Sequence, residues 1–332
     1  MKQTELLISI SKLTPFQKGR LEMYIIDALK LNESDENVKP SLCPYCKQET
    51  DMIKKGFKRG KQRYQCKGCK HVFTYNSHTI TMYSKIERSM FQKIILDTLN
   101  CIPLKQTAAE LDLSITSVFE NRHKVLCALE EILNQEDVQL SGTIEFDETY
   151  ELESQKGTKQ TNRKARKRGG PSKFRGISHE QVCIVTTTDR NGHEIFKAVG
   201  FGKPTTHSIQ DNFGGKLVKK SIVYTDGVTT YDQLIKDSDC TTVQLKTYVS
   251  YNQVEHLNTL NCIHSLMKRQ LSAFRGVATK YMNRYMSLFV FIRRFQSMDD
   301  NEKLPILLSK MNNLHFRKSR LTLKTFNLFS RC

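Results

Sequence analysis

The spacing of apolar residues divides this chain into a helical stretch and a later stretch in which strands and helices alternate. Between residues 84 and 135, apolar side chains recur every three or four positions, as in Phe91, Ile94, Ile95 and Leu99, and this spacing predicts helices. After residue 140, short runs rich in β-branched and aromatic residues predict strands. Residues 1–40 are only mildly amphipathic, and we expect a helical arm there.

The elements predicted after residue 140 follow one another in a recognisable order. They are three strands, a helix, a strand, a helix, a strand and two helices. Their approximate bounds are 142–150, 182–188, 194–199, 207–213, 221–225, 228–235 and 242–246, followed by helices from 258 and from 279. Asn191-Gly192 between the second and third strands is a strong hairpin signal. This order is the ribonuclease H-like α/β plan, in which the fourth strand lies beside the first.

Two aspartates occupy related places in this plan. Asp147 lies at the centre of the first strand, where a lone buried carboxylate would be costly to desolvate. Asp226 ends the fourth strand. A divalent cation held between the two carboxylates would make both charges tolerable, so the pair predicts a metal site.

The helix from residue 258 is expected to supply a third group. At about 100° per residue, one narrow polar stripe contains Asn258, Asn261, Ser265 and Lys268. The opposite, apolar side contains Leu260, Ile263, Met267 and Leu271. A polar stripe on an isolated helix is usually a solvated face, but in this plan the stripe would point toward the aspartates.

Four of the ten cysteines form two closely spaced pairs, Cys43-Pro-Tyr-Cys46 and Cys66-Lys-Gly-Cys69. Each pair can form a tight turn that aims both thiolates at one point, and two such turns make a tetrahedral structural zinc site. The chain is long and begins without a signal-peptide core, which favours metal binding over disulfides. We therefore predict a four-cysteine zinc ribbon over residues 41–76.

The charge balance indicates a polyanionic partner. Lysine and arginine number 52 and aspartate and glutamate 34, a formal net charge of +18. Nucleic acid or an anionic membrane would suit this excess, but no apolar run is long enough to span a bilayer. We expect a cytoplasmic protein that binds nucleic acid and does not contact a membrane.

Residues 84–137 are interpreted as a helix-turn-helix region. Ala108 and Ala109 would allow two helices to cross closely, and Ser114 can cap a recognition helix from Ile115 to Lys124. The candidate DNA-facing residues are Thr116, Ser117, Glu120, Asn121, Arg122 and Lys124. Helical hairpins of this kind are often only structural, which is the alternative.

A second basic segment lies at residues 154–179, where periodicity is lost. Its most concentrated basic residues are Arg163, Lys164, Arg166, Lys167 and Arg168. Next to a metal site, such a loop would hold DNA phosphates, whereas by itself it would be interpreted as a surface insertion.

Taken together, these motifs over residues 43–296 resemble the bacterial insertion-sequence transposases of the DDE superfamily that carry a zinc ribbon. The matching motifs are the CxxC pairs, Ile144-Glu-Phe-Asp-Glu-Thr-Tyr150, the basic stretch 163–170, Tyr224-Thr-Asp-Gly227 and Asn258-Thr-Leu-Asn261 followed by His264-Ser-Leu-Met-Lys268. In that family an acidic residue precedes a lysine by seven positions, and here Asn261 and Lys268 have this spacing. Some members are understood to use asparagine.

The resemblance implies a catalytic set of Asp147, Asp226, Asn261 and Lys268. Two Mg²⁺ or Mn²⁺ ions would be held by the aspartates and the amide oxygen of Asn261, and Lys268 would contact a phosphate. Because Asn261 is neutral, Glu255 or Glu148 could complete the metal site instead. The implied partners are transposon ends and target DNA, bound by a homodimer or larger assembly.

The sequence therefore predicts a multidomain α+β protein. Its regions are an N-terminal arm (1–40), the zinc ribbon (41–76), the helix-turn-helix (84–137), the catalytic domain (140–297) with its basic insertion, and a tail (298–332). The leading function is that of an insertion-sequence transposase that cleaves and transfers DNA strands. The alternatives are a domesticated DNA-binding protein without catalysis and a structure-specific nuclease.

Overall fold

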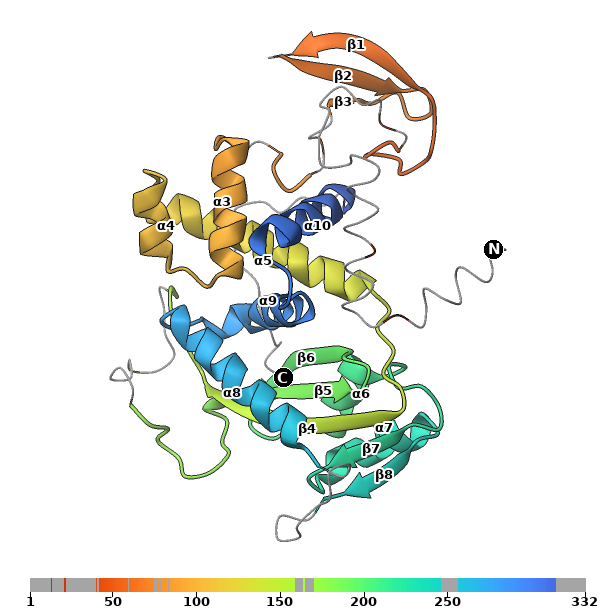
Figure 1. The fold of residues 1–332 in the computed structure, drawn as a ribbon, viewed down its shortest axis with the longest axis vertical. Coiled ribbons are helices and arrows are strands. Elements are labelled where there is room, and N and C mark those ends of the chain that lie inside the picture. Colours follow the sequence, from red (N-terminus) through yellow and green to blue (C-terminus); the bar gives the residue numbers. More distant parts are fainter. Residues whose placement is uncertain are drawn as a thin grey trace.

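The structure is a computed structural model that describes residues 13, 21, 40, 42–58, 60–74, 77, 79–82, 84–158, 164, 170–245 and 256–314. A small three-stranded sheet, a group of helices and a five-stranded sheet follow one another along the long axis of the molecule (Figure 1). The expected N-terminal arm falls almost entirely outside the described residues.

Within its described residues, the first half of the chain supplies the small sheet and three helices. They are β1 (Met52–Lys58), β2 (Lys61–Cys66), β3 (Val72–Thr74), α3 (Arg88–Leu99), α4 (Leu104–Glu110) and α5 (Ile115–Gln135). The second half begins with β4 (Thr143–Leu152), β5 (Gln181–Asp189), β6 (Glu194–Phe201), α6 (Thr206–Phe213), β7 (Ile222–Thr225), a 3₁₀ turn (Thr229–Tyr231), α7 (Asp232–Asp237) and β8 (Thr241–Gln244). It ends with α8 (Asn258–Ala273), a 3₁₀ turn (Thr279–Tyr281), α9 (Met282–Arg294) and α10 (Asp300–Asn313).

The five-stranded sheet has the order β6-β5-β4-β7-β8. The strands β4, β5 and β6 pair antiparallel, whereas β7 and β8 run parallel to β4. The predicted hairpin joins β5 to β6, with Gly192 in the left-handed region at φ 83°. Asp189 fixes this turn, because its Oδ1 accepts the backbone N–H groups of Asn191 and His193. The predicted succession of strands and helices after residue 140 is confirmed.

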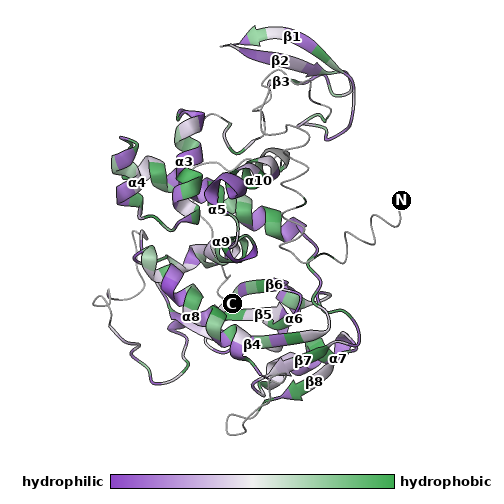
Figure 2. Cartoon of the chain, viewed as in Figure 1, coloured by the Kyte–Doolittle hydropathy of each residue, from purple (hydrophilic) through white to green (hydrophobic). Residues whose placement is uncertain are grey.

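Two hydrophobic cores lie on the two faces of this sheet. Alternate residues of β5 point to opposite cores, Val182 and Ile184 toward α8 and α9, and Cys183 and Val185 toward α6 and α7. Because successive side chains of a strand alternate between faces, the nearly continuous apolar run of β5 is what a strand buried on both faces requires. Figure 2 shows the corresponding mixture of hydrophobic and hydrophilic residues along the covering helices.

The first of these cores extends well beyond the sheet. It joins apolar residues of α3, α5 and α10 to those of α8 and α9. The region predicted as a helix-turn-helix and the region predicted as catalytic therefore share one continuous apolar core, although we expected them as separate domains.

The segment after residue 298 was expected to be a tail without an assigned role. Residues 300–313 instead form α10, which packs against α3 and α5. The Asp299 side chain caps the helix by accepting the Glu302 backbone N–H at 3.0 Å. The Glu302 side chain in turn accepts the Asp299 backbone N–H at 3.0 Å. Ile306 and Leu307 are fully buried. Over the described residues, no helix is both long and apolar enough to cross a membrane.

Candidate functional site

The parallel pairing of β4 with β7 brings the two predicted aspartates together. The register pairs Thr143 with Ile222 and Glu145 with Tyr224. Continued by two more residues, the same register places Asp147 across from Asp226, just where β7 ends. The sheet therefore brings together two residues that lie far apart in the sequence, as we expected from the predicted strand order.

Glu148 joins the two aspartates. One carboxylate oxygen from each of Asp147, Glu148 and Asp226 lies within 4.8 Å of the others. Asp147 Oδ1 accepts the Glu148 backbone N–H at 2.8 Å, and Asp226 Oδ1 accepts the Val228 N–H at 3.3 Å. Asp226 is followed by Gly227 at φ 92°, a conformation that favours glycine and turns the chain away directly after the carboxylate.

The donor set fits a hard divalent cation. Three carboxylates supply the oxygen ligands that Mg²⁺ and Mn²⁺ prefer. Oε1 of Glu148 is buried, and the side chain of Tyr231 partly offsets the effect of burial on the pKa of this carboxylate. The pKa of Asp147 is raised to about 7, chiefly by burial, and the charges of Asp226, Glu148 and Glu145 contribute to this rise. Burial also raises the pKa of Glu148. Burial is the main cause of both shifts, and the charge of Asp226 contributes to both.

Glu145, two residues before Asp147, holds the helix that faces the site. Its side chain is 1% exposed, and Oε2 accepts the Leu260 backbone N–H in the first turn of α8 at 3.2 Å. Oε1 forms an ion pair with Arg190 Nη1 at 2.7 Å. Leu257 at the N-cap of α8 makes no side-chain cap, so a carboxylate from a distant strand serves this helix end. Sequence reasoning missed this role.

Helix α8 packs on β4 and β5 with the predicted apolar side inward (Figure 1). Leu260, Ile263 and Met267 are buried, whereas Asn261 and Lys268 are exposed. Burial raises the pKa of Glu151 on β4, and the positive charge of Lys268 partly offsets this rise. Lys268 therefore lies near β4.

The residue of α8 that approaches Asp147 is His264, which the sequence prediction did not include. Its Nδ1 lies 3.7 Å from Asp147 Oδ2, and its Nε2 lies 2.6 Å from Thr186 Oγ1. Glu255, the proposed substitute ligand, lies outside the described residues. Glu148, the other substitute, is the one found beside the aspartates.

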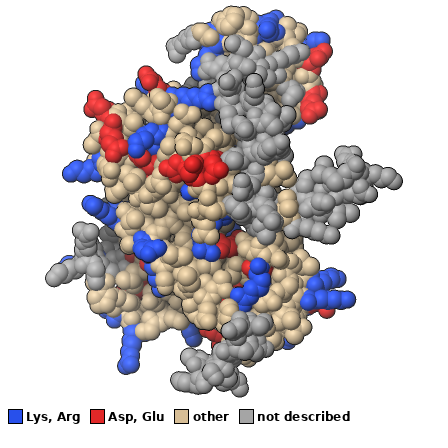
Figure 3. Space-filling model, in the orientation of Figure 1, with Lys and Arg blue, Asp and Glu red and all other residues tan. Residues whose placement is uncertain are grey.

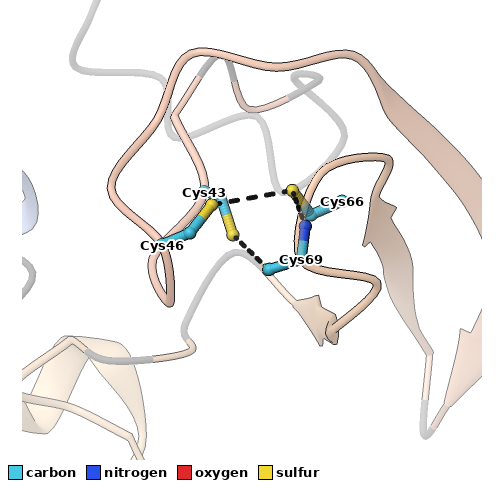
Figure 4. A group of neighbouring side chains, drawn as sticks. All are labelled: Cys43, Cys46, Cys66 and Cys69. Carbon is cyan, nitrogen blue, oxygen red and sulfur yellow. Dashed lines mark hydrogen bonds between the residues drawn. The ribbon is translucent and has the colours of Figure 1, made fainter.

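The four predicted zinc ligands also converge (Figure 4). Cys43 Sγ lies 3.5 Å from Cys69 Sγ, and Cys46 Sγ lies 3.8 Å from Cys66 Sγ. A tetrahedron with Zn–S bonds of about 2.3 Å has edges of about 3.8 Å, so the thiolates fit zinc.

The two CxxC turns have the same backbone design. Lys47 N–H bonds to the Cys43 carbonyl and Lys70 N–H to the Cys66 carbonyl, at 2.9 and 3.0 Å. Both lysines adopt a positive φ, 55° and 64°. The hydrogen bond from Thr50 is the main reason that the pKa of Cys66 is lowered to about 6, which favours the thiolate.

The predicted recognition helix is only partly available to DNA. Ser114 caps α5 as expected, and its side chain accepts the Ser117 N–H. Arg122, however, is 1% exposed and donates from Nη2 to the Ile102 carbonyl at 2.7 Å. Asn121 is 7% exposed and donates to the Ser117 carbonyl. The prediction that Arg122 and Asn121 face DNA is therefore wrong, because both bond to protein acceptors.

The other candidate DNA contacts differ in exposure. Thr116 is exposed, and Ser117, Glu120 and Lys124 are half-buried. Of the basic residues predicted in the loop, Lys164 is described and exposed, while Arg163, Arg166, Lys167 and Arg168 lie outside the described residues. On the face drawn in Figure 3, the described lysines and arginines are scattered and interspersed with acidic side chains.

Comparisons with known proteins point to transposition. Residues 139–294, which contain both aspartates and α8, match the family model of the ISXO2-like transposase domain. A protein of Halobacterium salinarum, described as an uncharacterized protein in transposable element ISH50, is 28% identical over 275 residues. That match covers 80% of this chain and 90% of the relative. The resemblance to insertion-sequence transposases is thereby confirmed.

Proposed function

We propose that this chain, which carries a transposase domain, cuts and joins DNA as the transposase of a bacterial insertion sequence. It would bind the terminal inverted repeats of its element, hydrolyse a phosphodiester bond at each end and transfer the freed 3′-hydroxyl to target DNA. The observation that carries the proposal is the placement of Asp147 beside Asp226 through the β4–β7 register.

The strand order supports a ribonuclease H-like catalytic domain. In sequence order its five strands are arranged 3-2-1-4-5, with the first three antiparallel and the last two parallel to the first. Helices cover both faces, and the acidic residues lie where the central strand meets the end of its parallel neighbour. Ligands of open α/β sheets bind at this kind of edge.

Each proposed catalytic residue has a role that follows from its place. Two Mg²⁺ or Mn²⁺ ions would supply an activated oxygen nucleophile and stabilisation of the leaving oxygen. Asp147, Asp226 and Glu148 would hold the ions, and Asn261 would offer a neutral amide oxygen from the exposed side of α8. Lys268, two turns further along α8, would contact a DNA phosphate.

DNA binding would be shared between two regions. The zinc ribbon exposes Lys54, Lys55 and Lys58 on β1 together with the exposed ring of Phe57. A basic strand with an exposed aromatic ring suits phosphate contacts with stacking. The exposed start of α5, at Thr116, would contribute from the helical region. Because two transposon ends must be paired, we expect a homodimer or larger assembly.

The test is cleavage of a DNA duplex that carries the element's terminal repeat. Wild-type protein should nick the repeat end with Mg²⁺ or Mn²⁺ and not with EDTA. Asp147→Asn and Asp226→Asn should each reduce the rate by at least about a hundredfold while retaining repeat binding. Asp211→Asn, a charge change at an exposed ion pair on α6, is the matched control. Unchanged cleavage by the Asp147 and Asp226 variants would refute the proposed site.

One observation favours a second candidate function. The third position of the catalytic motif is the neutral, exposed Asn261 rather than a carboxylate, and a weaker site suits a DNA-binding protein that no longer cuts. This candidate predicts repeat binding without cleavage, unrescued by Asn261→Glu. Metal-dependent cleavage by the wild-type protein would exclude it.

A further inference from the structure

The hydrogen bonds of Thr186 determine which nitrogen of His264 carries a proton. Thr186 Oγ1 lies 3.0 Å from the backbone carbonyl oxygen of Asp147 and 2.6 Å from His264 Nε2. A carbonyl oxygen can only accept, so the single hydroxyl proton of Thr186 is directed to Asp147. Nε2 must then donate its own N–H to Thr186 Oγ1.

This assignment leaves Nδ1 of neutral His264 with an unshared electron pair. His264 is 8% exposed, and Nδ1 points toward Asp147 Oδ2 at 3.7 Å. Among the described residues, no hydrogen bond to Nδ1 occupies this electron pair. Two electron-rich atoms therefore face each other across a gap that is too long for a hydrogen bond.

We propose that Nδ1 of His264 is a metal ligand, which shares a cation with Asp147 Oδ2 on the α8 side of the site. This inference rests on the proposed function only in placing a metal at Asp147. Ligand atoms at about 2.1 Å from one ion are about 3.0–3.6 Å apart, close to the observed 3.7 Å. A second-shell bond that fixes the tautomer, here from Nε2 to Thr186, is typical of metal-binding histidines.

The position of His264 relative to the three carboxylates suggests two ion positions. His264 lies outside the group formed by Asp147, Glu148 and Asp226, although it approaches the same Asp147. Asp147 would then belong to both positions, one completed by Asp226 and Glu148 and the other by His264. The neutral Asn261, three residues earlier on α8, would no longer have to replace a missing carboxylate alone.

A nitrogen ligand changes the expected metal preference. Imidazole is a better ligand for transition metals than for Mg²⁺, whereas carboxylates serve both. The position next to His264 should therefore bind Mn²⁺ more tightly than Mg²⁺.

The experiment is pulsed electron paramagnetic resonance of Mn²⁺ added to the zinc-loaded, full-length protein. Directly bound imidazole gives an electron spin echo modulation from ¹⁴N, which oxygen ligands do not give. We expect this modulation in the wild type, its replacement by a ¹⁵N pattern after labelling with [¹⁵N]histidine, and its loss in His264→Gln. Mn²⁺ affinity should fall at least about tenfold in His264→Gln.

The chain offers a closely matched control in His256. Its Nδ1 also lies 3.7 Å from a buried carboxylate, that of Glu145, but it accepts the Asn258 N–H at 3.3 Å and faces Arg190. His256→Gln should therefore leave the ¹⁴N modulation unchanged. Thr186→Val, which removes the acceptor of Nε2, should weaken Mn²⁺ binding while keeping the modulation.

The outcomes separate this inference from the proposed function. Absence of ¹⁴N modulation in the wild type, or its persistence in a folded His264→Gln protein, would overturn the inference even if the protein cleaves DNA. Modulation that depends on His264, in a protein that never cleaves DNA, would support the inference and leave the proposed function refuted. If His264→Gln does not fold, the wild-type spectrum with and without [¹⁵N]histidine, repeated in His256→Gln, still decides.

Discussion

Replacing Glu145 with glutamine should destabilise the protein by loosening α8 from the sheet. The side chain is 1% exposed and connects three segments: β4 itself, the first turn of α8 through Leu260 N–H, and the β5–β6 turn through Arg190. Glutamine keeps the shape and one acceptor oxygen but removes the charge.

The expected cost follows from those two contacts. A hydrogen bond to a charged group contributes about 1.5–3 kcal/mol and a neutral one about 1 kcal/mol, so the Leu260 contact should lose about 1 kcal/mol. The ion pair with Arg190 adds about 1 kcal/mol rather than more, because the arginine is 37% exposed and solvent screens it. The total is about 2 kcal/mol, which corresponds to a melting temperature about 4–8 °C lower for a unit of this size.

The assay is thermal unfolding of the full chain followed by near-ultraviolet circular dichroism without added Mg²⁺. A double-mutant cycle with Arg190→Gln should give a coupling free energy of about 1 kcal/mol. Asp211→Asn, at a pair whose side chains are 87% and 57% exposed, should change the melting temperature by less than about 1 °C. A Glu145→Gln protein as stable as the wild type would refute the argument that this carboxylate holds α8.

Four further predictions concern the acidic site, the zinc ribbon and α5. Because burial raises the pKa of Asp147 to about 7, the metal-free folded state keeps a proton that the unfolded chain has lost between about pH 4 and 7, so stability should fall as pH rises through this window. For the same reason Mg²⁺ or Mn²⁺ binding at pH 6 should release about one proton, and calorimetric heats that do not depend on the buffer would contradict this. Each chain should hold one zinc ion, and Cys66→Ser should release it and open β1–β3 to hydrogen exchange while the five-stranded sheet stays protected, because we expect so small a core to need the metal in order to fold. Arg122→Leu should cost about 2–4 kcal/mol, yet the salt dependence of DNA binding should not change, whereas a lost phosphate contact would reduce the slope by about 1.

Much of the sheet was predictable because its strands carry local signals. The β-branched runs and the Asn191-Gly192 turn are readable without knowing the rest of the fold. The proximity of Asp147 and Asp226 required one further assumption, the strand order, and the observed register agrees with it. The two CxxC pairs predicted the convergence of four thiols because each turn is closed locally.

The missed features depend on contacts that no local pattern contains. Arg122 looked like a surface residue, but its acceptor is the carbonyl of Ile102 in the connection between α3 and α4. His264 could have been packed core or a site residue, and only the placement of α8 against Thr186 decides. The capping box that begins α10 is present in the sequence, but the helix contains Pro305, which is uncommon inside helices.

The parallel pairing of β4 with β7 has a consequence for protein synthesis. The hairpin β5–β6 and α6 are made between these strands, so a chain interrupted on the ribosome after α6 already contains Asp147 but lacks Asp226. Such a fragment has Asp147 on β4, but it has neither β7 nor the Asp226 that follows β7. A product that ends before β7 therefore cannot form this carboxylate pair, which exists only once the long-range sheet has closed.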